Sequence, residues 1–479
     1  MSELASIADS EGNPDGRAFL DSCGCVGVRT RFAHLAALNL SGNDNTMATQ
    51  IEKTSSRRTG TGSLHTLGVL CGVTAGVWLG AAEAPTKLVN AGFSPFAISL
   101  CMVAGVFTAR WSFPTLLKGT AYVFSDLMSR KHLLVWAILA GALWAVANTL
   151  TVFAIRDVGL AVAFPMWNTN ALVGLFWGRV LFRELDGADG KTITKVVVGS
   201  FCIVAAAIML GFSTVHGGTS PNGHNALGGV LAAIGASLMW GTMYVPYRKA
   251  YLSGMNPLSF VTVFTVGELL TMFILTWTLD GGRHSSVFQL IRGGQYLFWL
   301  FLGGFVWVIG DMFQQFAAKY LGIGRGIPLS NTNQLWGLAW GALVFGELAT
   351  ADAKHKLLVV AGSAVMIVGA LFISTAKASA AEHSSRNEAL ERECDRYGLE
   401  YTEVLLAQSG EEVGHRLEGR RWWDYAIILA AVGVFIWLGA KAVVPPLMMN
   451  FKWVAVLGVL LLASLIGCGY RLYKQTGFS

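Results

Sequence analysis

Long apolar runs alternate with short polar connections along most of the chain, after a polar start of about 60 residues. The first ten runs lie near 66–89, 94–112, 133–155, 159–182, 194–215, 226–250, 257–279, 296–319, 322–345 and 356–376. Each is close to the roughly 20 residues that a helix needs to cross the hydrocarbon core of a bilayer. Two more apolar runs, near 424–446 and 452–473, follow a charged stretch. The pattern predicts an all-α polytopic membrane protein.

The first ten apolar runs contain an internal repeat. The stretch from Trp144 to Leu185 recurs without a gap from Trp307 to Leu348, at a constant offset of 163 residues. In both copies a proline precedes an Asn-Thr-Asn triplet inside an apolar run, in 165–170 and 328–333. Such repeats are typical of transporters built from two related halves. Since five helices per half is an odd number, the second half must insert with opposite orientation. We therefore predict ten transmembrane helices as two inverted five-helix repeats, plus a C-terminal two-helix hairpin.

This pattern divides the chain into five parts. They are a polar N-terminal tail (1–64), the first repeat (65–215), the second repeat (226–376), a charged cytoplasmic linker (377–422), and an extra transmembrane hairpin with a short tail (423–479). Met47 opens the segment MATQIEKTSSRRTG, and we expect translation to begin there, with 1–46 untranslated. Apolar positions between Leu399 and Leu406 are compatible with a short amphipathic helix or with a solvated segment.

Composition and charge support a membrane location. The chain is 53% hydrophobic and 13% charged, whereas soluble domains carry roughly 25% charged residues. The net charge of +6 fits loops that face an anionic leaflet and does not indicate nucleic-acid binding. Twelve Lys and Arg residues, among them Arg110 and Arg248, fall in loops assigned to one side, against six on the other. The positive-inside rule then predicts cytoplasmic N- and C-termini in a bacterial inner membrane.

The sequence carries none of the usual signatures of an enzyme, a metal site or a nucleotide-binding loop. Its seven cysteines are scattered, with neither metal-ligand spacing nor a disulfide framework. The segment 187–192 resembles a phosphate loop but lacks the first glycine and follows no strand. We therefore expect no catalytic residue, no metal and no cofactor. Any transport must use a gradient or downhill diffusion.

Three carboxylates lie at membrane depth, where a charge costs roughly 2.5–3.5 kcal/mol. Glu268 is at the middle of its apolar run, and Asp311 takes the position that Asn148 has in the first half. Glu83 lies near a helix end, at the position of Tyr244 in the second half. Buried acids can take up and release a proton during transport. The structural alternative is a hydrogen bond to a neighbouring helix.

Amide side chains follow the two prolines. Asn168 and Asn170 lie in the first half, Asn331 and Asn333 in the second, and Gln314 in the eighth run. A proline leaves a backbone carbonyl unpaired, and an asparagine can satisfy that carbonyl. Alternatively, the amides face a cavity and offer donors and acceptors to a hydroxyl-rich solute. These five residues, together with Asn148 and Tyr244 at the positions paired with Asp311 and Glu83, are therefore candidates for substrate binding.

Two further groups of residues have both a structural and a functional interpretation. Four tryptophans have flat apolar faces that can pack against a sugar ring or simply within the helix bundle: Trp78, Trp144, Trp240 and Trp307. Glu184 and Glu347 lie at helix ends, where we expect them to meet water and nearby basic residues.

Four motifs within residues 66–376 carry a family resemblance. Phe345-Gly-Glu-Leu348 followed by AGSAVMIVGALFIS is similar to the EamA-type end of a repeat half. The others are Trp144-x-x-x-Asn148, the stretch from Trp167 to Gly174, and Trp240-Gly-Thr-x-x-Val-Pro246. Together they resemble the glucose/ribose/rhamnose-transporter-like branch of the drug/metabolite transporter superfamily. The resemblance implies alternating access around a central cavity lined mainly by helices one, three, four, six, eight and nine. Residues 377–479 depart from the ten-helix pattern.

We predict a secondary transporter that moves a small polar solute, a sugar, inward together with a proton. Asp311 or Glu83 would carry the proton, and the asparagines would bind hydroxyl groups. The alternative is an exporter of amphiphilic metabolites, drugs or amino acids, with tryptophan and methionine as the binding surface. A membrane-embedded enzyme or scaffold is a third class. The expected partners are the solute, a proton and the lipid bilayer, and the sequence leaves open whether the protein forms homo-oligomers.

Overall fold

A computed structural model describes residues 61–82, 84, 93–158, 163, 166–213, 226–280, 289–346, 352–410, 419–444 and 449–478. The expected start at Met47, the acid Glu83 and the helix-end residue Glu347 lie outside these residues. The regular structure of the described residues consists of helices, and no strand occurs among them.

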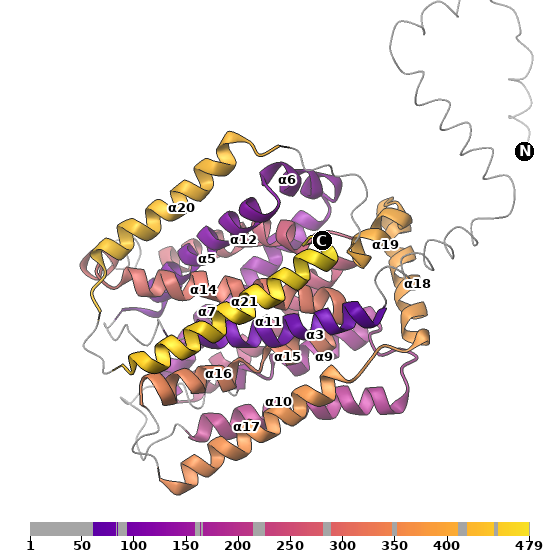
Figure 1. The fold of residues 1–479 in the computed structure, drawn as a ribbon. Coiled ribbons are helices and arrows are strands. Elements are labelled where there is room, and N and C mark those ends of the chain that lie inside the picture. Colours follow the sequence, from indigo (N-terminus) through magenta and orange to yellow (C-terminus); the bar gives the residue numbers. More distant parts are fainter. Residues whose placement is uncertain are drawn as a thin grey trace, which may run out of the picture. The chain divides into compact units, whose positions relative to one another are not determined.

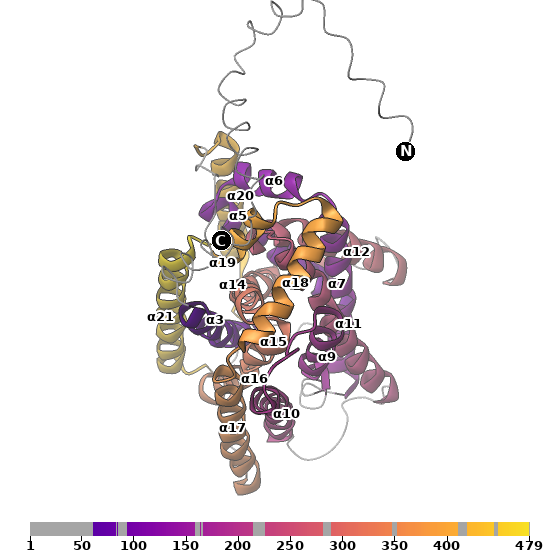
Figure 2. The same cartoon turned by 90° about the vertical axis from the view of Figure 1, so that its right-hand side faces the viewer.

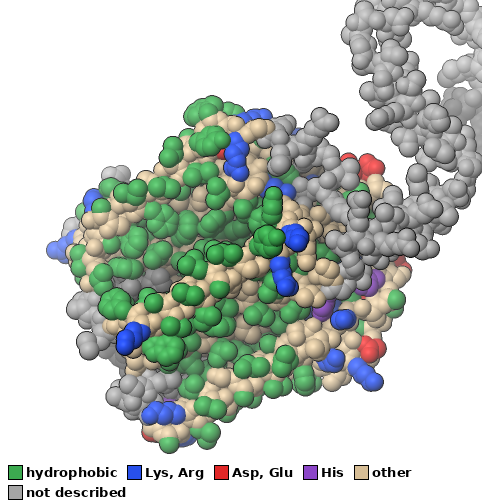
Figure 3. Space-filling view, in the orientation of Figure 1, with side chains coloured by type: hydrophobic (Ala, Val, Ile, Leu, Met, Phe, Trp, Pro, Cys, Tyr) green, Lys and Arg blue, Asp and Glu red, His purple; other side chains and the backbone are tan. Residues whose placement is uncertain are grey.

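Ten helices in the described part of the chain are long and apolar enough to cross a membrane. They are α3 (Thr61–Ala81), α5 (Pro95–Leu117), α7 (Leu133–Val158), α10 (Gly190–Ser213), α11 (Ala226–Leu252), α12 (Pro257–Leu279), α14 (Leu297–Leu321), α17 (Ala353–Ser374), α20 (Trp422–Lys441) and α21 (Phe451–Thr476) (Figure 1). Hydrophobic side chains are spread across the face shown in Figure 3, as expected of a surface in contact with lipid. The prediction of an all-α, multi-pass integral membrane protein is confirmed.

Shorter helices complete the fold: α6 (Thr120–Ser129), α9 (Asn170–Phe182), α15 (Ile323–Ser330), α16 (Asn333–Ala339), the π-helix η2 (Trp340–Val344), α18 (Ala380–Tyr397) and α19 (Tyr401–Ser409). The predicted continuous segment 322–345 is therefore wrong in detail, because it is divided into α15, α16 and η2. Pro328 removes one backbone donor from α15, and the chain turns at Asn331 and Thr332 before α16 begins. The break brings side-chain and backbone polar groups to the interior of the bundle, where they need partners.

Glycines allow two pairs of helices to cross at close range. A Cβ atom on Gly105 of α5 would lie 2.1 Å from the carbonyl oxygen of Phe301 in α14. A Cβ atom on Gly141 of α7 would lie 2.0 Å from the carbonyl oxygen of Phe264 in α12. Small residues of this kind let transmembrane helix backbones approach each other. The two crossings pair α5 with α14 and α7 with α12, and α12 in turn packs against α5.

Helices α18 and α19 (residues 380–409, here called the strap) pack across the ends of α11 and α15 (Figure 2). Arg325 of α15 donates two hydrogen bonds to Glu382, with nitrogen–oxygen distances of 2.6 and 2.8 Å. Lys249 of α11 pairs with Glu393 at 2.8 Å. The amide of Gln408 donates to the last carbonyl groups of α11. From the sequence, the stretch between Leu399 and Leu406 was compatible with either an amphipathic helix or a solvated segment. Its residues from Tyr401 onward form helix α19, which packs against α11.

Replacing Glu382 by glutamine is expected to lower the melting temperature and to flatten its pH dependence. Burial by itself would raise the pKa of Glu382, but the hydrogen bond and charge of Arg325 outweigh burial and hold this pKa below its ordinary value. An ionised Glu382 therefore stabilises the fold above the unfolded-state pKa, and this contribution is lost as the pH falls through the lower folded-state pKa. Melting temperatures of the purified protein across acidic pH would test this.

The matched control is Glu391→Gln, because Glu391 is exposed on the same helix. We expect E391Q to follow the wild-type curve, whereas E382Q starts lower at neutral pH and falls less on acidification. Identical curves for both variants and the wild type would show that the ion pair does not stabilise the docked strap.

Candidate functional site

A cavity of about 340 Å³ lies among α3, α5, α7, α11 and α14 and the chain segments around the starts of α9 and α16. Seven of the residues predicted from the sequence line it: Asn148, Asn168, Asn170, Tyr244, Gln314, Asn331 and Asn333. Met102 of α5 also lines the cavity, so the second helix contributes in addition to the six helices expected. Both halves of the chain therefore supply polar groups to one site.

Four tryptophans line the same cavity as two edge-to-face pairs. The ring centroids of Trp144 and Trp307 are 5.0 Å apart, and those of Trp167 and Trp240 are 6.1 Å apart. Trp78 instead donates a hydrogen bond of 3.2 Å to a serine of α21, and it is not among the cavity residues. Trp167 was not among the predicted site residues, because its counterpart in the second copy is a serine. Its position directly before the first triplet is the signal that could have identified it.

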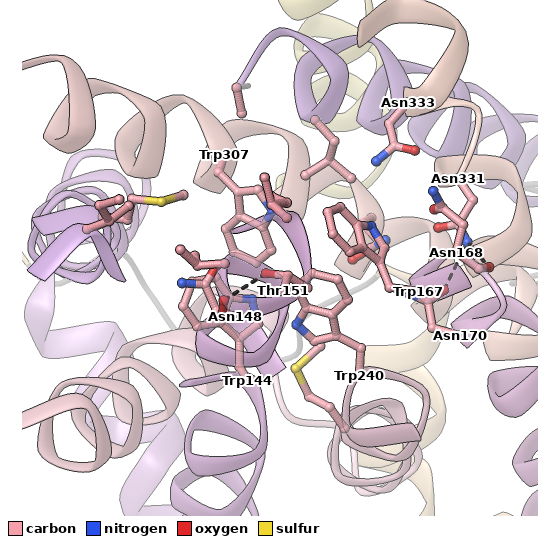
Figure 4. Close-up of a pocket in the computed structure, with 18 of the residues that line it drawn as sticks. Trp144, Asn148, Thr151, Trp167, Asn168, Asn170, Trp240, Trp307, Asn331 and Asn333 are labelled. Carbon is pink, nitrogen blue, oxygen red and sulfur yellow. Dashed lines mark hydrogen bonds between the residues drawn. The ribbon is translucent and has the colours of Figure 1, made fainter. Parts of the chain in front are cut away.

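The two Asn-Thr-Asn triplets meet where the fourth helix of each half is interrupted. Asn331 donates through Nδ2 to Oδ1 of Asn170 at 2.9 Å and to the backbone carbonyl of Asn168 at 3.1 Å. Asn168 in turn donates to Oε1 of Gln334 at 2.7 Å. In Figure 4 the four asparagines of the two triplets lie on one side of the cavity. Trp144, Trp307 and Asn148 lie on the other side, and Trp167 and Trp240 lie between the two groups. The amides thus satisfy each other at the chain breaks and also face the cavity.

A buried charged cluster joins three helices. Arg110 of α5 contacts Asp311 of α14 through Nη2 and Oδ2 at 2.6 Å, and Glu268 of α12 through Nη1 and Oε1 at 3.2 Å. All three side chains are 0% exposed. Gln315 donates a further hydrogen bond of 2.8 Å to Oδ1 of Asp311. The structure therefore brings two of the three predicted acids together, although neither of them lines the cavity.

The assignment of Arg110 to a cytoplasmic loop is wrong. Helix α5 continues to Leu117, five residues beyond the predicted end at 112, and Arg110 lies inside it. Two buried acids require a cation, and an arginine within an apolar run is the signal that could have identified this residue. The guanidinium carbon of Arg110 lies 4.1 Å from the ring centroid of Phe264 and 5.3 Å from that of Trp307. Because Trp307 lines the cavity, one ring separates the charged cluster from the site.

A second group of charges joins the end of α9 to the second half. Glu184 accepts hydrogen bonds from the backbone N–H groups of Ile323 and Gly324, at 3.0 and 2.8 Å. It also pairs with Arg248 of α11, with 3.0 Å between Nε and Oε1. Arg248, like Arg110, was assigned to a loop and is buried within its helix. The carboxylate holds the positive end of α15, where a helix favours an anion.

Comparisons with known proteins show the family to which the chain belongs. The family model described as "Sugar transport protein" matches residues 90–213 and 231–393. A Listeria innocua protein named "Putative sugar uptake protein" is 24% identical over 245 residues, which is 50% of this chain and 78% of that protein. A protein of the same name from Streptococcus pyogenes serotype M6 is 26% identical over 253 residues, 51% of this chain and 80% of that one. The matched residues include the charged cluster and most of the cavity, and the chain belongs to the sugar transport protein family.

Proposed function

We propose that this protein carries a sugar across the membrane as a proton-coupled secondary transporter. The observation that carries the proposal is the cavity, in which two tryptophan pairs and six amide side chains from both halves meet. A sugar ring presents CH groups that pack on indole faces. Its hydroxyl groups both donate and accept hydrogen bonds. Amide side chains can pair with them because each amide has an NH2 donor and a carbonyl acceptor.

The charged cluster supports proton coupling through its charge balance. With both acids ionised, Arg110, Glu268 and Asp311 together carry one net negative charge at sites that are 0% exposed. A buried charge without a partner is costly. One proton on either carboxyl group cancels that charge. Trp307 contacts Arg110 and also lines the cavity. A change of charge in the cluster would therefore change the electrostatic environment of the site where the sugar binds.

Alternating access is supported by the unequal ends of the bundle. The cavity is lined by the last turn of α3, the early turns of α5 and the late turns of α7. Glu184, its partner Arg248 and the strap lie toward the opposite ends of α9 and α11. We propose that this end, which is held together by these ion pairs and the strap, faces the cytoplasm of a bacterial cell, with both termini on that side of the inner membrane, as the distribution of basic residues predicts.

We further propose that residues 65–215 and 226–376 are inverted repeats, and that the family is related to the drug/metabolite transporter superfamily. The close crossings support this. Gly105 of α5 and Gly267 of α12 are separated by 162 residues, and Gly141 of α7 and Gly304 of α14 by 163. Both α5–α14 and α7–α12 are thus crossings at equivalent glycines of the two halves.

An exporter of amphiphilic metabolites, drugs or amino acids is the second candidate. Besides the tryptophans, Met102 and Met243 line the cavity. Flexible thioether side chains adapt to varied apolar ligands. Export of such compounds would depend less on hydrogen bonds from the amide side chains than sugar binding does.

Uptake into proteoliposomes tests the first proposal against the second. With an inward proton gradient, the purified wild-type protein should accumulate a labelled sugar above its external concentration. Asp311→Asn should abolish this accumulation and keep exchange of internal for external sugar, because the neutral cluster no longer binds a proton. The control is Asp186→Asn, since Asp186 is 41% exposed and pairs with an exposed arginine.

Three results would contradict the proposal. Uphill accumulation that survives in both D311N and Glu268→Gln would exclude the cluster as the coupling site. Uptake that is indifferent to the gradient in the wild type would exclude proton coupling. Transport restricted to hydrophobic cations or amino acids would favour the exporter.

A further inference from the structure

We infer that Glu268, and not Asp311, binds the exchangeable proton of the charged cluster, while Asp311 stays ionised as the fixed counter-ion of Arg110. The inference rests on the proposed proton coupling and names the group that performs it. It follows from how differently the two carboxyl groups are held by their neighbours.

Both oxygens of Asp311 accept hydrogen bonds. Arg110 donates to Oδ2 at 2.6 Å, and the amide of Gln315 donates to Oδ1 at 2.8 Å. The hydroxyl of Tyr251 donates to Oε1 of Gln315 and so fixes the amide with its NH2 group toward Asp311. A carboxyl group that receives a donor on each oxygen is favoured in its ionised form. Gln315 and Tyr251 are therefore positioning residues that keep Asp311 charged.

Glu268 has much weaker support. Its Oε1 lies 3.2 Å from Nη1 of Arg110, and neither carboxyl oxygen has a hydrogen bond of good geometry from a described residue. Thr265, on the preceding turn of α12, also interacts with it. The side chain is 0% exposed. An ionised Glu268 would be a surplus buried charge, whereas the neutral acid costs less to keep out of water.

The part of the chain that the structure describes supplies no second cation to Glu268. Among the described residues, the titratable groups that interact with it are Arg110, Asp311 and Tyr247 of α11. Tyr247 is a neutral phenol at physiological pH and adds no charge. Arg110 is already engaged by Asp311 at the shorter distance. Proton binding to Glu268 would bring the cluster from one negative charge to neutrality, and proton release would restore the charge.

Isotope-edited infrared difference spectroscopy can separate the two acids, because the carbonyl band of a protonated carboxyl group moves to lower frequency when its carbon is 13C. The full-length protein would be made by cell-free synthesis in two forms, with carboxyl-13C glutamate or with carboxyl-13C aspartate. Difference spectra between a near-neutral and an alkaline sample, both above the pH range in which exposed carboxyl groups titrate, need no sugar. We expect the protonated-carboxyl band to move in the glutamate-labelled protein alone and to be lost in E268Q.

Gln315→Leu provides a second variant that keeps both acids. It removes one donor from Asp311, so we expect part of the protonated band to move to the aspartate label. If the protonated-carboxyl band of Q315L responded to the two labels as it does in the wild type, Gln315 would not be a positioning residue. A wild-type band that moves with the aspartate label would overturn the assignment to Glu268 and leave the proposed transport intact.

The test also separates failure of the inference from failure of the proposed function. A wild-type protein with no protonated-carboxyl band attributable to either acid at any pH would contradict both the assignment and proton coupling. A Glu268 band together with uptake that is indifferent to a proton gradient would keep the protonation site and exclude its role in coupling.

Discussion

Replacing Arg110 by methionine is expected to destabilise the protein by about 3–5 kcal/mol, because two buried carboxyl groups lose their cation. Arg110 is the partner of both Glu268 and Asp311, and all three side chains are 0% exposed. Methionine keeps much of the volume and removes the charge. The loss should appear as a lower melting temperature in detergent, or as protein that aggregates during size-exclusion chromatography.

The control for R110M is Arg179→Met. Arg179 is 52% exposed and pairs with Asp186 at 3.2 Å, and exposed pairs contribute at most about 1 kcal/mol. A triple variant, R110M with E268Q and D311N, removes all three charges and should recover much of the lost stability. It should not couple transport to protons. If R110M melted like the wild type, the cluster would not be held together by the ion pairs described.

The apolar pattern predicted the spanning helices because each of them follows from local sequence alone. The repeat, in turn, predicted that Asn168, Asn170, Asn331 and Asn333 share a role, and all four line the cavity. The division of 322–345 into three short helices was not predictable from the pattern. Pro328 and the Asn-Thr-Asn triplet lie inside this run, but the ends of the short helices depend on hydrogen bonds between amides of the two halves, such as Asn331 to Asn170.

Arg110 shows why charged partners are hard to assign from sequence. Arg110 lies near the end of the predicted apolar run 94–112. An arginine at a helix end is common and marks the cytoplasmic side. Its partner Asp311 is 201 residues away along the chain. Only the crossing of α5 with α14 brings the two together. The docking of the strap could not be predicted for the same reason, since Glu382 looks like a solvated charge until Arg325 is placed beside it.

Replacing Glu184 by alanine is expected to have an effect as large as that of R110M. The change leaves Arg248 without its anion in a site where both side chains are 7% exposed. It also leaves the backbone N–H groups of Ile323 and Gly324 without an acceptor. Losing one partner of a buried pair costs about 3–5 kcal/mol. We expect a lower melting temperature and loss of sugar uptake, because α15 is no longer tied to the end of α9.

Glu184→Gln and Asp186→Ala separate the contributions to this effect. Glutamine can accept one of the two backbone hydrogen bonds but does not pair with Arg248, so E184Q should fall between E184A and the wild type. Asp186, two residues further along, is 41% exposed, and D186A should melt like the wild type. Equal melting temperatures for E184A and D186A would mean that Glu184 does not hold α15. A stable E184A that still transports would show that Glu184 is dispensable here and that other contacts, such as Arg325 with Glu382, hold α15 in place.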